Sequence, residues 1–247
     1  MKAGQFLIGA GVGFGAALAV RHAAPVLASV TPIARRVVPT LSGVGRGGHV
    51  ALTFDDGPDP ASTPKFLEVL DAYNVSATFF MLGSMTRRAP SLAAEIAAAG
   101  HEIAVHGDEH ISMLRRTTRA AIDDVRRAHN DIAELTGTQP RFFRPPYGQL
   151  SRGALKAADA CGLQTVLWTA WGRDWRAAAT PDTVLADLER GTLDGGTVLL
   201  HDSDCTSAPL AWRSALGALP DLMTMCAQRG LVVGPLRDHF DVVAVAS

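Results

Sequence analysis

The sequence predicts an α/β fold built on a parallel sheet, either open or closed into a barrel. Between residues 49 and 235, short apolar runs rich in strand formers alternate with helical patterns about seven times, and no segment repeats. Polar motifs directly follow several of the apolar runs, where such folds place their active sites. The length of 247 residues and the apolar fraction of 47% allow a sizeable core and exclude a disordered or fibrous chain.

The first strand is expected at 50–54, and it ends abruptly at Asp55-Asp56-Gly57-Pro58. Thr63 and Pro64 are typical of a helix N-cap and first turn, so a helix follows. Further helices are expected at 91–99, before Gly100, and at 118–136, before Gly137. The remaining strands are expected at 77–82, 102–105, 142–143, 165–168, 198–200 and 231–233.

Residues 1–48 differ from the rest and are interpreted as an N-terminal signal or anchor followed by a linker. Residues 6–20 form an uncharged apolar stretch after Lys2, too short for an ordinary membrane span but suited to a signal peptide or signal anchor. Arg21, Arg35 and Arg36 follow it, and the positive-inside tendency would place that flank in the cytoplasm. We expect an extracytoplasmic protein, secreted or associated with the membrane. Residues 42–48 are glycine-rich and predict a linker, which leaves 49–247 as the catalytic domain.

The charge pattern argues against a general nucleic-acid binder. The net charge is −1, but the arm before Asp55 carries five basic and no acidic residues, and the rest carries 18 basic and 24 acidic ones. Three cysteines are too few for a disulfide scaffold, and the lack of a CxxC spacing argues against a thiolate zinc site. One disulfide bridge with a free thiol and three buried thiols both remain open.

Two motifs suggest a metal centre. Adjacent carboxylates diverge, so in Asp55-Asp56 one could bind a metal while the other faces a reacting water; an isolated pair could equally cap a loop. His106 and His110 are four residues apart, a spacing that on a helical turn lets two imidazoles chelate one ion. Two histidines and one aspartate leave coordination positions open for water, as in hydrolytic zinc sites.

Three further motifs follow predicted strands or lie close to one. Arg144-Pro145-Pro146-Tyr147 suits a rigidly placed guanidinium and a backbone N–H directed at an oxyanion. His201 ends an apolar run, and Asp174-Trp175 follows another. An aspartate behind a histidine raises the pKa of the imidazole and helps it act as a general acid.

In this order the motifs resemble the polysaccharide deacetylases, carbohydrate esterase family 4, over roughly residues 49–235. The resemblance implies a distorted (β/α) barrel of seven or eight strands and a divalent metal, with zinc the first choice. It implies Asp55 as general base, Arg144 as the residue that orients it, and His201 as general acid tuned by Asp174. The metal ligands would be Asp56, His106 and His110. The Tyr147 N–H would hold the oxyanion, and the acetyl pocket would be lined by Tyr147, Trp175 and Leu199.

Two positions depart from the family pattern. Gly107 stands where Ser or Thr usually follows the first metal histidine, so one supporting hydrogen bond is expected to be missing. Trp171 stands where the fourth motif usually begins with Asp. Because the three ligands, the base and the acid all remain, we expect an active enzyme with an altered substrate groove.

The resemblance implies a metal-dependent hydrolase that removes N-acetyl groups from an N-acetylhexosamine glycan of peptidoglycan or chitin type and releases acetate. One alternative is O-deacetylation of an acetylated polysaccharide by the same centre. Another is an inactive glycan-binding surface protein. A glycosidase is disfavoured, because neighbouring carboxylates such as Asp55 and Asp56 rarely flank a bond from both sides.

Overall fold

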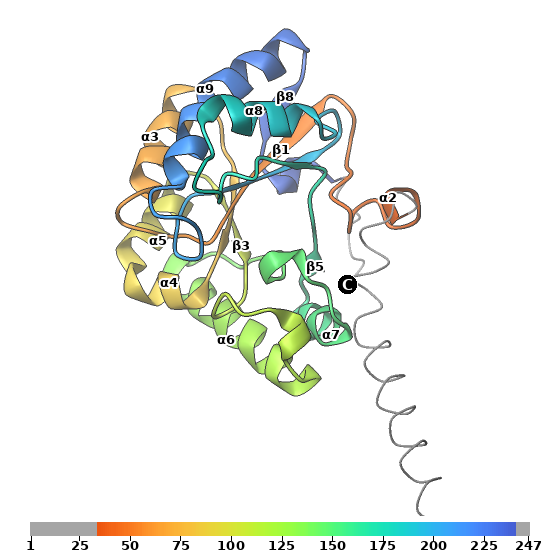
Figure 1. The fold of residues 1–247 in the computed structure, drawn as a ribbon. Helices are drawn as coiled ribbons and strands as arrows, with labels where there is room; N and C mark the ends of the chain where they lie inside the picture. Colours follow the sequence, from red (N-terminus) through yellow and green to blue (C-terminus); the bar gives the residue numbers. More distant parts are fainter. Residues whose placement is uncertain (1–33, 241–247) are drawn as a thin grey trace, which may run out of the picture.

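The computed structural model describes residues 34–240 and contains a single curled sheet of eight parallel strands (Figure 1). The strand order is β5-β4-β3-β2-β1-β7-β6, and β8 pairs with the beginning of β1. The edge strands β5 and β6 do not pair with each other, so the barrel is distorted and open on one side. The expected fold class is confirmed. The strands are β1 His49–Asp55, β2 Thr78–Met81, β3 Glu102–Val105, β4 Phe142–Phe143, β5 Gln164–Thr165, β6 Ala170–Trp171, β7 Thr197–His201 and β8 Val232–Gly234.

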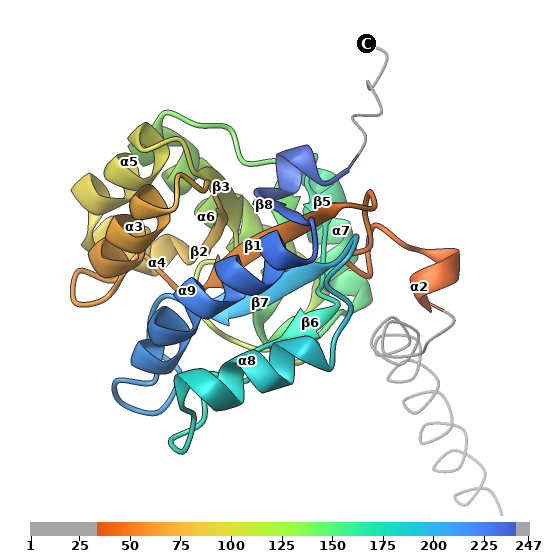
Figure 2. The ribbon, with the colours of Figure 1, turned by 90° about the horizontal axis from the view of Figure 1, so that it is seen from above.

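Helices cover the outer side of the sheet. Figure 2 shows α3, α4 and α5 beside one part of it and α8 and α9 beside another. Helices α6 and α7 pack against each other near β3, β4 and β5. The helices are α2 Ala34–Val37, α3 Thr63–Ala72, α4 Gly83–Arg88, α5 Pro90–Ala98, α6 Thr118–Thr136, α7 Arg152–Ala160, α8 Pro181–Glu189 and α9 Trp212–Gln228, with 3-10 turns η1 Met113–Arg115, η2 Pro146–Gly148 and η3 Leu236–Asp238.

The alternation of side chains along β1 decides what faces the inside of the barrel. Val50, Leu52 and Phe54 point outward into the large apolar core under the helices. Thr53 and Asp55 alternate with them and therefore point inward. The same parity turns Leu199 and His201 of β7 inward, and Asp55 lies level with His201 in the register. The strand ends thus deliver polar groups to one mouth of the barrel.

Several sequence expectations need correction. Residues 165–168 were predicted as one strand. In the structure, β5 ends at Thr165, and a separate strand, β6, begins at Ala170. Helix α4 was not predicted, because its six residues are too few to show a helical apolar stripe.

Residues 42–48 do not behave as a free linker. Thr197 donates a hydrogen bond from Oγ1 to the carbonyl of Gly43 (2.8 Å), and Gly45 N–H donates to the carbonyl of Gly195 (2.9 Å). A Cβ at Gly43 would lie only 3.0 Å from Thr197, so glycine here allows close packing rather than flexibility. The domain boundary at residue 48 stays a prediction.

The predicted apolar segment 6–20 lies outside the described residues. Among residues 34–240, no helix is long and apolar enough to cross a membrane.

Candidate active site

A cavity of about 320 Å³ opens at the carboxyl ends of β1, β3, β4 and β7, and most of the predicted site residues line it. The residues that line it come from strand ends and the loops that follow them: Asp55, His106, His110, Tyr147, Gly148, Trp168, Trp171, Trp175, Leu199, His201, Thr206 and Ser207.

Asp55 is held by a buried arginine. Arg144 Nη1 donates to Asp55 Oδ1 at 2.6 Å and to Thr53 Oγ1 at 2.8 Å. The guanidinium is fully buried, lies over the ring of Phe80, and donates from Nε and Nη2 to the backbone carbonyls of residues 166 and 167. Because Oδ1 is occupied in this way, Asp55 presents Oδ2 to the site, 3.7 Å from His106 Nε2.

Asp56 also reaches the site, although it follows Asp55 directly. Strand alternation would turn its side chain outward, but Asp56 has a φ of 81°, which turns the chain and brings the second carboxylate inward. This conformation is unfavourable for a residue with a Cβ, and such strain is found mainly where function requires it.

Asp56, His106 and His110 form a cluster with the dimensions of a metal site. Asp56 Oδ1 lies 3.4 Å from His106 Nε2 and 3.3 Å from His110 Nε2. A tetrahedron with metal–ligand bonds of about 2.0–2.1 Å has edges of about 3.3–3.4 Å. Asp56 Oδ1 is buried and accepts no hydrogen bond from any described residue. A buried oxygen without a hydrogen-bond donor is expected where the oxygen binds a metal ion. The residues therefore fit a divalent cation.

Both imidazoles can offer a lone pair from Nε2. His106 Nδ1 lies 2.8 Å from the carbonyl oxygen of Arg144, so Nδ1 carries the proton. Burial lowers the pKa of His110 to about 4, against the opposing charge of Asp56. Burial would raise the pKa of Asp56, but the adjacent imidazole of His106 and the charges of His201 and His110 outweigh it and hold that pKa below its usual range.

The segment that carries His106 and His110 is a loop and not the helical turn on which their spacing was interpreted. It bends at Gly107, whose φ is 99°, a value that side-chain-bearing residues rarely adopt. The first N–H groups of α4, from Gly83 and Ser84, donate to the carbonyls of Gly107 and Asp108 at 3.0 and 2.9 Å. The loop, rather than helical periodicity, brings the two imidazoles together.

Asp124 of α6 supports this loop from behind. Its Oδ2 accepts the N–H of Asp108 at 3.1 Å, and a Cβ at Gly107 would lie 3.1 Å from the same oxygen. His110 Nδ1 has no partner among the described residues, in keeping with the hydrogen bond expected to be missing at Gly107. In this chain the carboxylate of Asp124, from α6, supports the loop beside Gly107.

His201 and Asp174 are paired at the other side of the cavity. Asp174 Oδ1 lies 2.9 Å from His201 Nδ1, and Asp174 Oδ2 accepts the backbone N–H of His201 at 2.8 Å. Burial alone would lower the pKa of His201, but the charge and hydrogen bond of Asp174, helped by Asp56 and Asp55, raise it to about 10. The imidazole is therefore a cation near neutral pH and can donate a proton from Nε2.

The predicted substrate-binding residues Tyr147, Trp175 and Leu199 line the cavity. Trp168 and Trp171 line it as well, so the wall is more aromatic than predicted. Tyr147, with a φ of 60°, packs edge-on against His110 at 4.3 Å between ring centroids. Trp171 lies between Trp168 and Trp175, with centroid distances of 5.6 and 6.2 Å. Trp171, where the resemblance led us to expect an aspartate, thus joins the other two rings into one aromatic wall. That the Tyr147 N–H binds an oxyanion stays a prediction.

Sequence reasoning missed Thr206 and Trp168. Thr206 donates from Oγ1 to Asp56 Oδ2 at 2.8 Å, from a loop after β7 with no motif to mark it. Trp168 lies in a segment taken for a strand.

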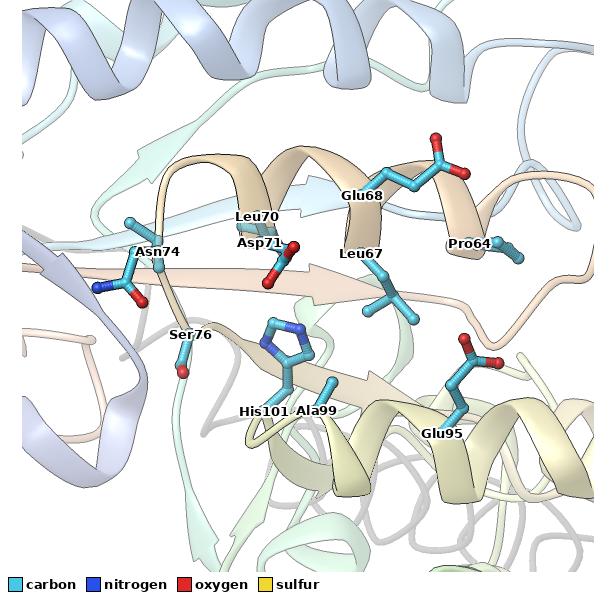
Figure 3. A pocket seen from close by; sticks show the side chains of 11 residues that line it. Pro64, Leu67, Glu68, Leu70, Asp71, Asn74, Ser76, Glu95, Ala99 and His101 are labelled. Carbon is cyan, nitrogen blue, oxygen red and sulfur yellow. The ribbon is translucent and has the colours of Figure 1, made fainter.

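A second cavity, of about 340 Å³, lies between α3 and α5 and has different chemistry (Figure 3). Its walls carry Glu68, Asp71 and Glu95, and Figure 3 shows the imidazole of His101 between the two helices. His101 Nδ1 accepts the N–H of Ala77 at 3.2 Å, so the proton stays on Nε2, which cannot then bind a metal. Among the described residues, Asp56, His106 and His110 form the only group of three or more side chains placed to hold a metal ion.

Comparison with known proteins agrees with the geometry. Residues 43–166 match the polysaccharide deacetylase family model. The chain is 33% identical over 174 residues to the peptidoglycan-N-acetylglucosamine deacetylase PgdA of Listeria monocytogenes, covering 69% of this chain but only 36% of that protein. It is 34% identical over 195 residues to a chitooligosaccharide deacetylase of a Bradyrhizobium species, covering 76% of this chain and 88% of the relative.

Solved structures give the same picture. The fold is similar to that of BA3943 from Bacillus anthracis, described as a pseudoenzyme of carbohydrate esterase family 4. The TM-score is 0.71 and the identity 27%, covering 79% of this chain and 66% of that one. On the family match, the identities and the shared architecture, the chain belongs to the polysaccharide deacetylase family.

Proposed function

We propose that this protein is a metal-dependent hydrolase that removes N-acetyl groups from an N-acetylhexosamine glycan and releases acetate. The observation that carries the proposal is the placement of three groups around one cavity: Asp55 on Arg144, the cluster of Asp56, His106 and His110, and the His201–Asp174 pair.

Asp56, His106 and His110 would hold the metal through one carboxylate oxygen and two imidazole nitrogens. This donor set favours zinc, and three protein ligands leave a position open for water and substrate. When bound, a divalent ion supplies a water of lowered pKa and polarises the acetyl carbonyl.

Asp55 acts as the general base. Its Oδ1 is tied to Arg144, so Oδ2 is the oxygen free to accept a proton from the attacking water. The fully buried guanidinium holds the carboxylate in this orientation.

His201 acts as the general acid. Its imidazolium, held by Asp174, donates a proton to the departing nitrogen. An amide requires this proton because an amide anion is a very poor leaving group, whereas an alkoxide leaves more readily. A pKa raised to about 10 keeps the acid charged near neutral pH, as cleavage of an amide requires.

A glycan substrate is supported by the relatives, which act on peptidoglycan N-acetylglucosamine and on chitooligosaccharides. The wall of Trp168, Trp171 and Trp175 offers an apolar face on which a sugar ring can stack. An inactive glycan-binding protein is disfavoured, because a decayed site would be expected to lose a ligand, the base or the acid, and all are present.

We also propose an extracytoplasmic location, supported by the apolar stretch 6–20 after Lys2. Recovery of the intact chain only in a soluble cytoplasmic fraction would refute it.

Acetate release tests the activity. The purified full chain is incubated with N-acetylglucosamine oligomers, peptidoglycan and acetylated xylan, with and without a chelator. We expect chelator-sensitive release from an N-acetylated glycan. Release from xylan alone would favour the esterase, and glycan binding without release in added zinc or cobalt would favour the inactive binding protein.

A further inference from the structure

The two oxygens of Asp56 have different surroundings, and one residue outside the family motifs causes the difference. Oδ2 accepts a hydrogen bond from Thr206 Oγ1 at 2.8 Å. Oδ1 accepts none from the described residues and faces His106 Nε2 and His110 Nε2. A carboxylate without such a bond could rotate and bind a cation through both oxygens.

We propose that Thr206 is a positioning residue that makes Asp56 a one-oxygen metal ligand. The inference rests on the proposed function, since it assumes that the cluster of Asp56, His106 and His110 holds a divalent cation. The hydroxyl occupies Oδ2 and fixes the plane of the carboxylate, so that Oδ1 alone points at the two imidazoles. Outer hydrogen bonds of this kind raise metal affinity by holding a ligand in its bound orientation.

The loop that carries Thr206 is anchored on both sides of it. Cys205 Sγ donates to the backbone carbonyl of Asp56 at 3.7 Å, a weak sulfur contact. Ala208 N–H donates to the carbonyl of Trp175 at 3.2 Å. Thr206 therefore reaches Asp56 from a backbone already tied to the aspartate turn and to the tryptophan wall. The hydroxyl is preorganised rather than free to swing away.

The position of the loop also links the two halves of the site. It follows β7, which ends at His201, so one short segment places both the acid and the support of the metal ligand. Thr206 therefore lines the cavity although no motif marks it.

The test compares three variants of the full chain. Thr206→Val keeps the shape of the side chain but removes the hydroxyl, and Thr206→Ser keeps the hydroxyl. Ser207→Ala removes a neighbouring hydroxyl that also lines the cavity but makes no bond to Asp56. Zinc affinity is measured by competition with a chelating dye, and cobalt-substituted protein reports the coordination number through its visible absorption.

We expect Thr206→Val to bind zinc about 10–100-fold more weakly. Its cobalt absorption should weaken as Asp56 becomes bidentate and the coordination number rises. Thr206→Ser should bind close to the unmodified chain, and Ser207→Ala should match it. The rescue by serine separates positioning from a folding defect.

Unchanged zinc affinity in Thr206→Val, or an equal loss in Ser207→Ala, would overturn the proposal while leaving the proposed function standing. Zinc binding that depends on Thr206 without any acetate release would support this inference and contradict the proposed function. A chain that binds no zinc would overturn both.

Discussion

Asp55 and Asp56 are chemically identical neighbours with different partners. Arg144 takes one oxygen of Asp55, and Thr206 takes one oxygen of Asp56. Each carboxylate is thereby left with one oxygen directed into the site, and we propose a different task for each of these oxygens.

Asp55→Asn should keep the metal but lose most of the activity, because the amide cannot accept the proton of the attacking water. The loss expected from removing a general base is about 10²–10⁴-fold in kcat. Metal content and acetate release are measured on the same preparation. Asp71→Asn, the same change on α3 outside the site, is the control. Near-normal turnover in Asp55→Asn would contradict the assignment of the base.

Asp174→Asn should move the alkaline limb of the pH–rate profile to lower pH. Asp174 provides the main contributions that raise the pKa of His201 against burial, so without it the imidazole loses its proton at lower pH. The profile of kcat/KM is measured from acid to alkaline pH, with metal content as the control. An unmoved limb would show that another group tunes His201.

At the level of elements, the loop from His106 to His110 depends on Gly107. Gly107→Ala should lower the free energy of unfolding by about 1–2 kcal/mol, because alanine disfavours the positive φ. Gly100→Ala should lower it by a similar amount, since Gly100 has a φ of 84° and open space around it. Only Gly107→Ala should also weaken zinc binding, because its Cβ would press on Asp124 Oδ2 beside the histidines. Chemical denaturation and zinc titration of both variants check this; equal zinc affinities would contradict it.

The elements also show what sequence patterns can and cannot predict. The position of polar motifs at the ends of apolar runs was enough to place Asp55 and His201 at one mouth of the sheet, because parallel strands end on the same side. Leu199 was predicted only from the family resemblance. The i, i+4 spacing of His106 and His110 correctly predicted that the two imidazoles lie together. The structure achieves this through the bend at Gly107 and not through a helical turn. Thr206 could not be predicted, because its contact with Asp56 joins residues 150 positions apart.

Across the whole molecule, the curled sheet buries titratable groups far from the site. Burial, with the charge of Arg237, lowers the pKa of His101 from 6.5 to about 4. Because the folded pKa lies below the unfolded one, this histidine contributes stability above about pH 6.5 that is lost as the pH falls toward 4.

His101→Asn removes the titration but keeps an acceptor for the N–H of Ala77. The free energy of unfolding, measured in urea at pH 7 and pH 4.5, should therefore fall less between the two pH values in the variant, by about 2 kcal/mol. Equal losses in both proteins would show that His101 is not among the groups that make the fold sensitive to acid.

In the proposed function, Asp56, His106 and His110 hold one divalent ion that the reaction requires. The most direct measurement is acetate release by metal-stripped full chain as zinc is added in sub-equivalent steps. Activity should rise linearly and stop at about one equivalent per chain, and His106→Ala should stay inactive throughout. Full activity in the stripped protein, or a His106→Ala variant that regains activity at one equivalent, would contradict the account.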